Sequence, residues 1–261
     1  GNFTAKKIKM VDTDFENAEG VFERLPDELK FAYIKGKFLN ANVSGGGSIL
    51  FNDEELTTFE AAIEHVDISS FKMLPGVLTG NGKMAAKFES KIVNPETGEK
   101  DIKVSGSIVA DEANFIKDGI NKFFGETLWK DLSETLKVQL NPEAEEKLGE
   151  ASLAVRDLKG AFELSKGKLN ISSLSFLNAD YKANFETSID EQGVVMGKGF
   201  IIPSKPLSSK LLPEIIQKSA FDKKGDFLLP IILGGKLPDF LVLFDITEFE
   251  DFFSGKAKPQ V

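Results

Sequence analysis

The sequence predicts an α+β fold: a mainly antiparallel, strongly twisted β-sheet that curls into a groove, with a helical insertion in the middle and a short helix near the C-terminus. Apolar and polar residues alternate in many short segments. In one of them Leu29, Phe31 and Tyr33 share a face, which is typical of half-buried strands. Glycine at the start of such segments, as at Gly82 and Gly106, would let a long sheet twist and bend. In the middle of the chain, by contrast, apolar residues recur at helical spacing.

Residues 1–110 predict an N-terminal antiparallel β segment. Turn residues mark breaks at Pro26-Asp27 and at Ser44–Gly47, and Asn94–Gly98 predicts a turn between the last two strands. We expect strands at Thr4–Val11, Asn17–Leu25, Leu29–Leu39, Ala41–Phe51, Phe59–Val66, Val77–Ser90 and Ile102–Ala110.

Residues 111–150 predict a helical insertion, because Phe115, Ile120, Leu128 and Leu132 follow the helical period and Asp111 is a suitable N-cap. Residues 151–261 then form a C-terminal β segment, which is either separate or continuous with the first. Its expected elements are a hairpin-like stretch at Leu158–Ile189, a strand at Val194–Ile202, a helix at Leu207–Ser219, an apolar strand from Leu229 to Gly235 and a strand at Phe240–Phe244.

Composition narrows the function classes. The net charge is −9 and the arginines are Arg24 and Arg156 alone, which disfavours nucleic-acid binding. The chain has no cysteine, which excludes disulfides, thiolate metal sites and thiol catalysis. No stretch reaches the ~18 apolar residues that span a bilayer. Because the chain opens abruptly at Gly1-Asn2, we expect a membrane anchor to precede it in the native protein.

Catalysis finds no support in the sequence, and we expect neither enzymatic activity nor a cofactor or metal. His65 is the only histidine, so a catalytic triad or a two-histidine metal site cannot form, and an ordinary strand histidine is the simpler interpretation. Nucleotide-binding and hydrolase motifs are absent. A glycoside hydrolase remains an alternative, disfavoured by the scarcity of tryptophan and tyrosine.

Residues 12–23 partly match a calcium-binding loop, with carboxylates at positions 1, 3, 5 and 12 of the pattern. However, Asn17 replaces the glycine that the sharp turn requires, and the flanking sequence is strand-like. We therefore interpret this segment as a solvated acidic hairpin. The acidic residues Glu248, Glu250 and Asp251 are likewise expected on an exposed face.

Several segments, taken in order, resemble the AsmA-like family. The closing run Pro230–Pro238 joins two apolar strands through Gly234-Gly235 and a Leu-Pro step, and it resembles the C-terminal domain of that family. Further matching segments are Phe31–Gly46, Val66–Ser69, Leu78–Lys83, Leu158–Phe162 and Gly167–Ile171. The helical stretch 111–150 departs from the family pattern.

The resemblance implies a non-enzymatic bacterial envelope protein, periplasmic and anchored to the inner membrane by an N-terminal helix. Its partner would be phospholipid, bound or conducted in an apolar β-groove in support of the outer membrane. The 23 phenylalanines, against 2 tyrosines and 1 tryptophan, suit such a lining, and they suit a dry core equally well. The alternative function is a periplasmic assembly module that binds protein partners through strand edges.

Alternation and the resemblance together select the residues expected to line the groove. Packing beneath the predicted helices is the competing interpretation for each of them. The candidates are Phe31, Tyr33, Met84, Phe88, Phe162, Leu164, Leu169, Ile171, Tyr181, Phe185, Phe200, Ile231 and Leu233.

Overall fold

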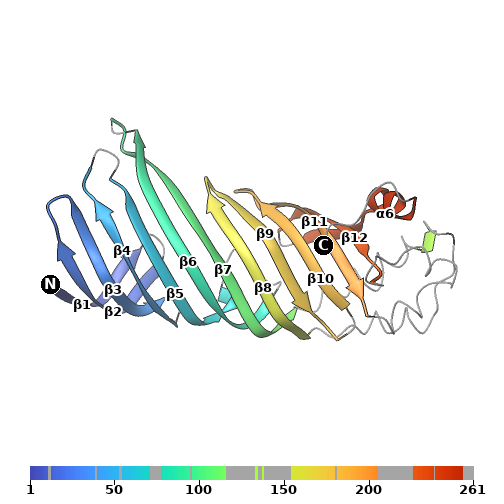
Figure 1. Ribbon diagram of the computed structural model, residues 1–261, viewed down its shortest axis with the longest axis horizontal. Coiled ribbons are helices and arrows are strands. Elements are labelled where there is room, and N and C mark those ends of the chain that lie inside the picture. The colour runs from blue at the N-terminus through green and yellow to red at the C-terminus, as the bar shows by residue number, and fades with distance from the viewer. Residues whose placement is uncertain are drawn as a thin grey trace.

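The computed structural model describes residues 1–10, 13–38, 40–52, 55–70, 78–94, 96–115, 133–134, 137, 154–179, 181–204, 226–237 and 239–254. Strands account for 78% of these residues, and they form one 13-stranded antiparallel sheet whose spatial order is the order of the sequence (Figure 1). The strands are β1 Asn2–Met10, β2 Thr13–Arg24, β3 Glu28–Phe38, β4 Ala41–Leu50, β5 Thr57–Asp67, β6 Leu78–Asn94, β7 Glu99–Phe115, β8 Ala154–Ser165, β9 Lys168–Leu177, β10 Tyr181–Ile189, β11 Val194–Pro203, β12 Leu229–Lys236 and β13 Asp239–Phe244. A 3-10 turn, η1, covers Ile68–Ser70, and a helix, α6, covers Ile246–Phe253.

The predicted α+β class is wrong, because the described residues are nearly all antiparallel β. Residues 111–115 belong to β7, so Asp111 does not begin a helix. The rest of the predicted insertion lies outside the described residues, apart from Ser133, Glu134 and Lys137, and so does the predicted helix at 207–219. β7 pairs directly with β8, from Lys103 with Ser165 to Asn114 with Ala154. The sheet is therefore continuous between the two predicted β segments.

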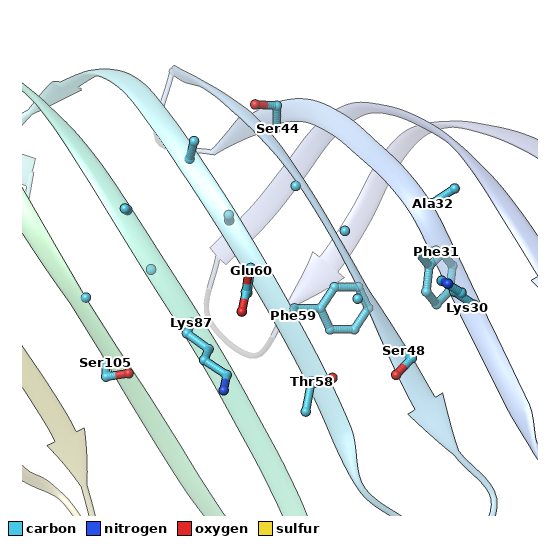
Figure 2. Close-up of a pocket in the computed structure, with 18 of the residues that line it drawn as sticks. Lys30, Phe31, Ala32, Ser44, Ser48, Thr58, Phe59, Glu60, Lys87 and Ser105 are labelled. Atoms are coloured by element: carbon cyan, nitrogen blue, oxygen red, sulfur yellow. The ribbon is translucent and has the colours of Figure 1, made fainter.

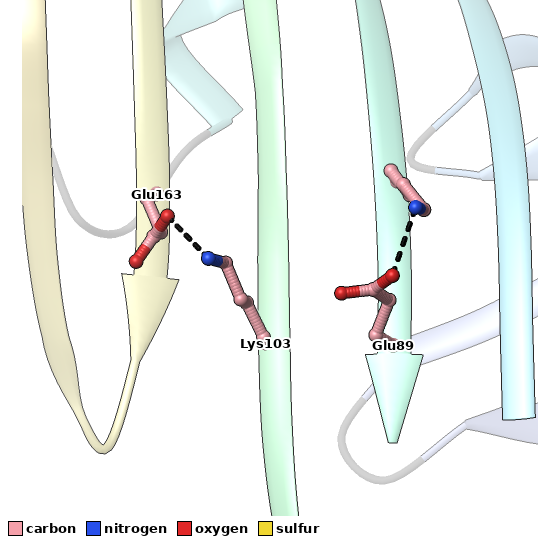
Figure 3. A network of polar contacts seen from close by, with 4 residues as sticks. Glu89, Lys103 and Glu163 are labelled. Carbon is pink, nitrogen blue, oxygen red and sulfur yellow. Dashed lines mark ion pairs between the residues drawn. The ribbon is translucent and has the colours of Figure 1, made fainter. Parts of the chain in front are cut away.

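Residues that pair across neighbouring strands point to the same side of the sheet. Over most of the strands, one face is apolar and the other is polar. On the polar face, Lys87 pairs with Glu89 at 2.8 Å and Lys103 with Glu163 at 2.7 Å (Figure 3). The hydrogen bond to Glu163, and then its charge, raise the pKa of Lys103, while the same two effects of Lys87 lower the pKa of Glu89. Because these side chains are exposed, such pairs contribute little to stability.

Several β-bulges bend the strands, and three of them contain a non-glycine residue with a positive φ angle. Asn17, His65 and Asp157 have positive φ angles of 51°, 59° and 51°, and the pairing register shifts at each of them. The residue after each of these three is apolar and buried, namely Ala18, Val66 and Leu158. A bulge sharpens the local bend of a strand, so these positions help the sheet curl around its apolar face.

The main hydrophobic core lies in the C-terminal half of the sheet. It is formed by the apolar face of β8–β13 together with Phe227, α6, Ile68 of η1 and the end of β7 at Ala110 and Ala113. The ring of Phe249 on α6 lies 5.2 Å from that of Phe244 and 6.3 Å from that of Phe227. A much smaller cluster, Ala41, Ile63 and Val66 with flanking Val43 and Met84, is buried in the N-terminal half.

Helix α6 carries Glu248, Glu250 and Asp251, which the sequence analysis expected on an exposed face. The Asp245 carboxylate caps the helix by accepting a hydrogen bond from the Glu248 backbone N–H at 3.0 Å. The acidic side chains thus belong to an amphipathic helix whose apolar side carries the buried Phe249.

Candidate functional site

A single transverse line of apolar residues crosses the apolar face from β2 to β13. Each member pairs in register with the next one, so the line runs perpendicular to the strands. We call it the apolar row. Its members are Phe22, Phe31, Gly47, Phe59, Phe88, Val104, Leu164, Leu169, Ile189, Val195, Gly235 and Phe240.

The N-terminal part of the apolar row is half-buried, and its rings converge. Phe22 lies 6.5 Å from Phe31, and Phe31 lies 5.5 Å from Phe59, between ring centroids. Phe3 on β1 approaches Phe31 on β3 to 6.2 Å, although a whole strand separates them. Neighbouring strands are spaced by about 4.8 Å, so rings two strands apart meet at this distance when they lean together over the strand between them. The ring of Phe3 does so over Gly20, which has no side chain to keep it away. This convergence of rings from strands that are not neighbours indicates that the apolar face is the inner face of the curled sheet.

A line of small residues runs beside the apolar row. Gly45, Ala61, Ala86 and Gly106 pair in register across β4, β5, β6 and β7. We call this line the small-residue row. Phe59 and Phe88 flank it on one side, and the row Val43, Ile63, Met84 and Ile108 flanks it on the other. Bulky side chains thus flank a line of methyl groups and glycines, and all four small residues line a pocket over β3 to β7.

Phe162 limits the small-residue row at its β8 end. Gly106 pairs with Phe162, and the ring atom Cζ lies only 2.9 Å from where a Cβ atom on Gly106 would be. The ring thus leans over the glycine. Beyond it the same line continues through the buried Ile171, inside the main core.

A wide-open pocket of about 900 Å³ lies against β3 to β7, where small residues occupy both faces of the sheet (Figure 2). Its lining includes Gly45, Ala61, Ala86 and Gly106 and also the residues that alternate with them. Those alternating residues carry charge at Lys30, Glu60 and Lys87, which belong to the polar face by register. The pocket lining therefore combines these charged side chains with glycine, alanine and the rings of Phe31 and Phe59.

The structure brings eleven of the thirteen predicted lining residues onto the apolar face, as the strand registers show. Phe31, Phe88, Leu164 and Leu169 belong to the apolar row. Phe162, Ile171 and Leu233 continue the small-residue row, and Met84, Phe185 and Ile231 belong to the row on its other side. Tyr181 lies two residues before Ala183 and four before Phe185, on the same face of β10.

Tyr33 and Phe200 depart from this arrangement. A bulge places both Ala32 and Tyr33 opposite Gly46, so alternation is broken after Phe31 and Tyr33 is 44% exposed. Phe200 lies between Gly199 and Ile201, which face the core, and so it points to the polar face. The expectation that these two residues share the apolar face is therefore wrong.

Burial divides the eleven residues further. Five are core residues with exposed fractions between 2% and 8%: Leu169, Ile171, Tyr181, Ile231 and Leu233. The remaining six are half-buried: Phe31, Met84, Phe88, Phe162, Leu164 and Phe185. Of these six, Phe162, Leu164 and Phe185 pack against the main core. Phe31, Met84 and Phe88 lie in the N-terminal half, where side chains of the apolar face stay accessible.

Sequence reasoning missed Phe3, Phe22 and Phe59 and the small-residue row. Two of these phenylalanines pair with a glycine on a neighbouring strand: Phe3 pairs with Gly20, and Phe59 pairs with Gly47. Local sequence cannot show this, because the partner residue and the register both lie on another strand. A search for Phe–Gly pairs across predicted hairpins is the signal that would have found them.

The structure does not assemble a catalytic or metal-binding site around His65 or the calcium-like segment over the described residues. His65 is exposed within its bulge, where the pairing register shifts between Glu64 and Val66. The part of the calcium-like segment after residue 12 forms β2, which is paired on both sides rather than looped around an ion. Over the described residues, no cluster of three or more acidic or histidine side chains could hold a metal ion. None of the described helices is long and apolar enough to cross a membrane.

Comparison with known proteins yields no match: no family model, no curated protein and no solved structure is similar to this chain.

Proposed function

We propose that the half-buried apolar face of β2–β7 binds an acyl chain of a phospholipid, without catalysis. The observation that carries this proposal is the apolar row, a continuous line of register-paired apolar positions that is accessible at one end and filled at the other. An accessible line of phenylalanines beside a line of glycine and alanine offers hydrocarbon both contact area and space.

The dimensions suit the ligand. From β2 to β7 the row makes five strand-to-strand steps, which is about 24 Å at ~4.8 Å per step. One leaflet of bilayer hydrocarbon is about 15 Å deep, so an extended acyl chain fits within the accessible part. Each methylene removed from water contributes about 0.8 kcal/mol, so shielding about ten of them would stabilise the complex by about 8 kcal/mol before the costs of binding.

The cellular setting is part of the same proposal. The resemblance to AsmA-like proteins supports a periplasmic location, an inner-membrane anchor N-terminal to this chain and a contribution to outer-membrane lipid homeostasis. A curled antiparallel sheet with an apolar inner face is the fold expected from that resemblance, and it supports the assignment on physical grounds alone. A second candidate, an assembly module that binds protein partners through strand edges, is favoured by the apolar edge strand β13.

Two adjacent alanines provide the test. Ala86 belongs to the small-residue row, while Ala85 precedes it on β6 and is exposed on the polar face. Ala86→Phe should fill the space above the row and weaken binding of anthroyloxy-labelled stearic acid by at least roughly tenfold, about 1.4 kcal/mol. Ala85→Phe adds the same ring to the other face and should bind the probe like the native chain.

The outcomes separate the possible sites. Loss of binding in Ala86→Phe alone supports the apolar face. Loss in Ala85→Phe alone would place the probe on the polar face and overturn the proposal. Equal affinity of all three proteins would also overturn it, and circular dichroism of each variant establishes that the fold is retained.

A further inference from the structure

The two edges of the described sheet differ in chemistry. β1 carries Lys6, Lys7 and Lys9, and charged side chains on an edge strand discourage pairing with other strands. The other edge strand, β13, ends in five consecutive apolar residues, Phe240–Phe244. An unprotected apolar edge strand is a template for a further strand.

β13 is apolar on both of its faces. Val242 pairs with Leu233 and Phe244 with Ile231, so they face the core. Leu241 and Leu243 point to the opposite side, where they are 58% and 39% exposed. Strands that are apolar on both faces are typical of the interior of a sheet, where each face is covered.

The outer apolar residues form a patch with those of the neighbouring strands. Met196 on β11 is 59% exposed and Ile232 on β12 is 39% exposed. Gly234 pairs with both Met196 and Leu241, and Ile232 pairs with Leu243, so these side chains are contiguous. Contiguous exposed apolar patches mark interaction surfaces.

We propose that β13 pairs antiparallel with β13 of a second copy of this chain, about a two-fold axis at Val242. The strand is self-complementary in this register, because Val242 lies opposite itself and Leu241 lies opposite Leu243. Side chains alternate along the strand, so the core-facing sides of the two copies match only when even-numbered residues lie opposite even-numbered residues, as they do here. Pairing would extend one sheet through both copies and cover the outer leucines of each edge with those of its partner.

Self-pairing of β13 is favoured over pairing of β13 with β1. A β13–β1 contact would repeat from copy to copy and build an open filament, and it would place the lysines of β1 beside apolar residues. One short strand pair buries a small area, so we expect a reversible dimer rather than a permanent one. This inference does not depend on lipid binding.

Cysteine cross-linking tests the register directly, since the chain has no cysteine of its own. In the proposed dimer the two Val242 Cα atoms are about 4.5 to 5.5 Å apart, within disulfide range. The two Leu241 Cα atoms are diagonal neighbours roughly 7 to 8 Å apart, too far for a strain-free disulfide. Val242→Cys should therefore form a covalent dimer under mild oxidation at least roughly tenfold faster than Leu241→Cys.

Random collisions predict the reverse order, because Leu241 is the more exposed residue. Faster cross-linking of Leu241→Cys, or equal rates, would overturn the proposal. Sedimentation velocity gives a second readout: the native chain should show a concentration-dependent dimer that Leu241→Lys abolishes. Met196→Lys, equally exposed but two strands from the edge, should leave the dimer intact. A native chain that stays monomeric would rule out self-pairing, and species larger than dimers would indicate pairing with β1.

Discussion

At the scale of single residues, glycines opposite phenylalanines let the strands approach and the sheet curl. A Cβ atom on Gly47 would collide with the Thr58 carbonyl oxygen and lie 2.8 Å from the Phe59 ring. The backbone of β5 therefore occupies the space that a side chain at position 47 would need. The glycine run 45–47, predicted as part of a break from the sequence, instead lies inside β4 for this reason.

Gly47→Ala should destabilise the fold by about 1 to 3 kcal/mol, because backbone has to move to admit the methyl group. Gly234→Ala is the matched control, since nothing among the described residues lies within 4 Å of its Cβ position. That control should change stability by less than about 1 kcal/mol. Urea unfolding measures both variants, and equal midpoints would show that the close approach at Gly47 does not constrain the sheet.

At the scale of elements, α6 contains an acidic side chain, Glu248, whose charged form is disfavoured by its surroundings. Burial, and then the nearby Asp245 carboxylate, raise the pKa of Glu248 above its ordinary value of 4.5. The Asp245 backbone N–H donates to the Pro230 carbonyl at 3.0 Å, so it is already engaged and does not offer Glu248 the usual capping-box partner.

Because the fold favours protonated Glu248, the folded state binds more protons than the unfolded state between pH 4.5 and the raised pKa. This residue therefore costs stability as the pH rises through that window. Glu248→Gln should raise the urea midpoint at pH 7 relative to the native chain, with a gap that closes toward pH 4. A gap of the same size at both pH values would contradict the account, since the effect would not then follow the carboxyl titration.

The strands themselves were largely predictable, whereas their irregularities were not. Alternation located most strands to within a few residues, as at Leu29–Leu39 for β3 and Val194–Ile202 for β11. The bulges at Asn17, His65 and Asp157 left no local signal, because a bulge is defined by the pairing of one strand with another. A further bulge lies between Phe31 and Ile34, and the simple alternation used in the sequence analysis therefore assigned Tyr33 to the wrong face of β3.

At the scale of the whole molecule, the apolar face changes character along the sheet. It is filled from β8 to β13, where α6 and Phe227 complete the core, and it is accessible from β2 to β7. Sequence reasoning could not separate groove from core, because both need the same alternating phenylalanine and leucine. It also assigned residues 111–115 to a helix, because a segment of five residues fits both the helical and the strand period. Their pairing with β8 makes them part of a strand.

Native mass spectrometry of the purified chain, before and after incubation with phosphatidylcholine vesicles, tests the central claim most directly. The account predicts that the native chain gains the mass of a bound phospholipid and that Ala85→Phe does the same, while Ala86→Phe stays at its apo mass. A native chain that remains apo after incubation would contradict it, and would mean that the phenylalanines of β2–β6 only pack against one another.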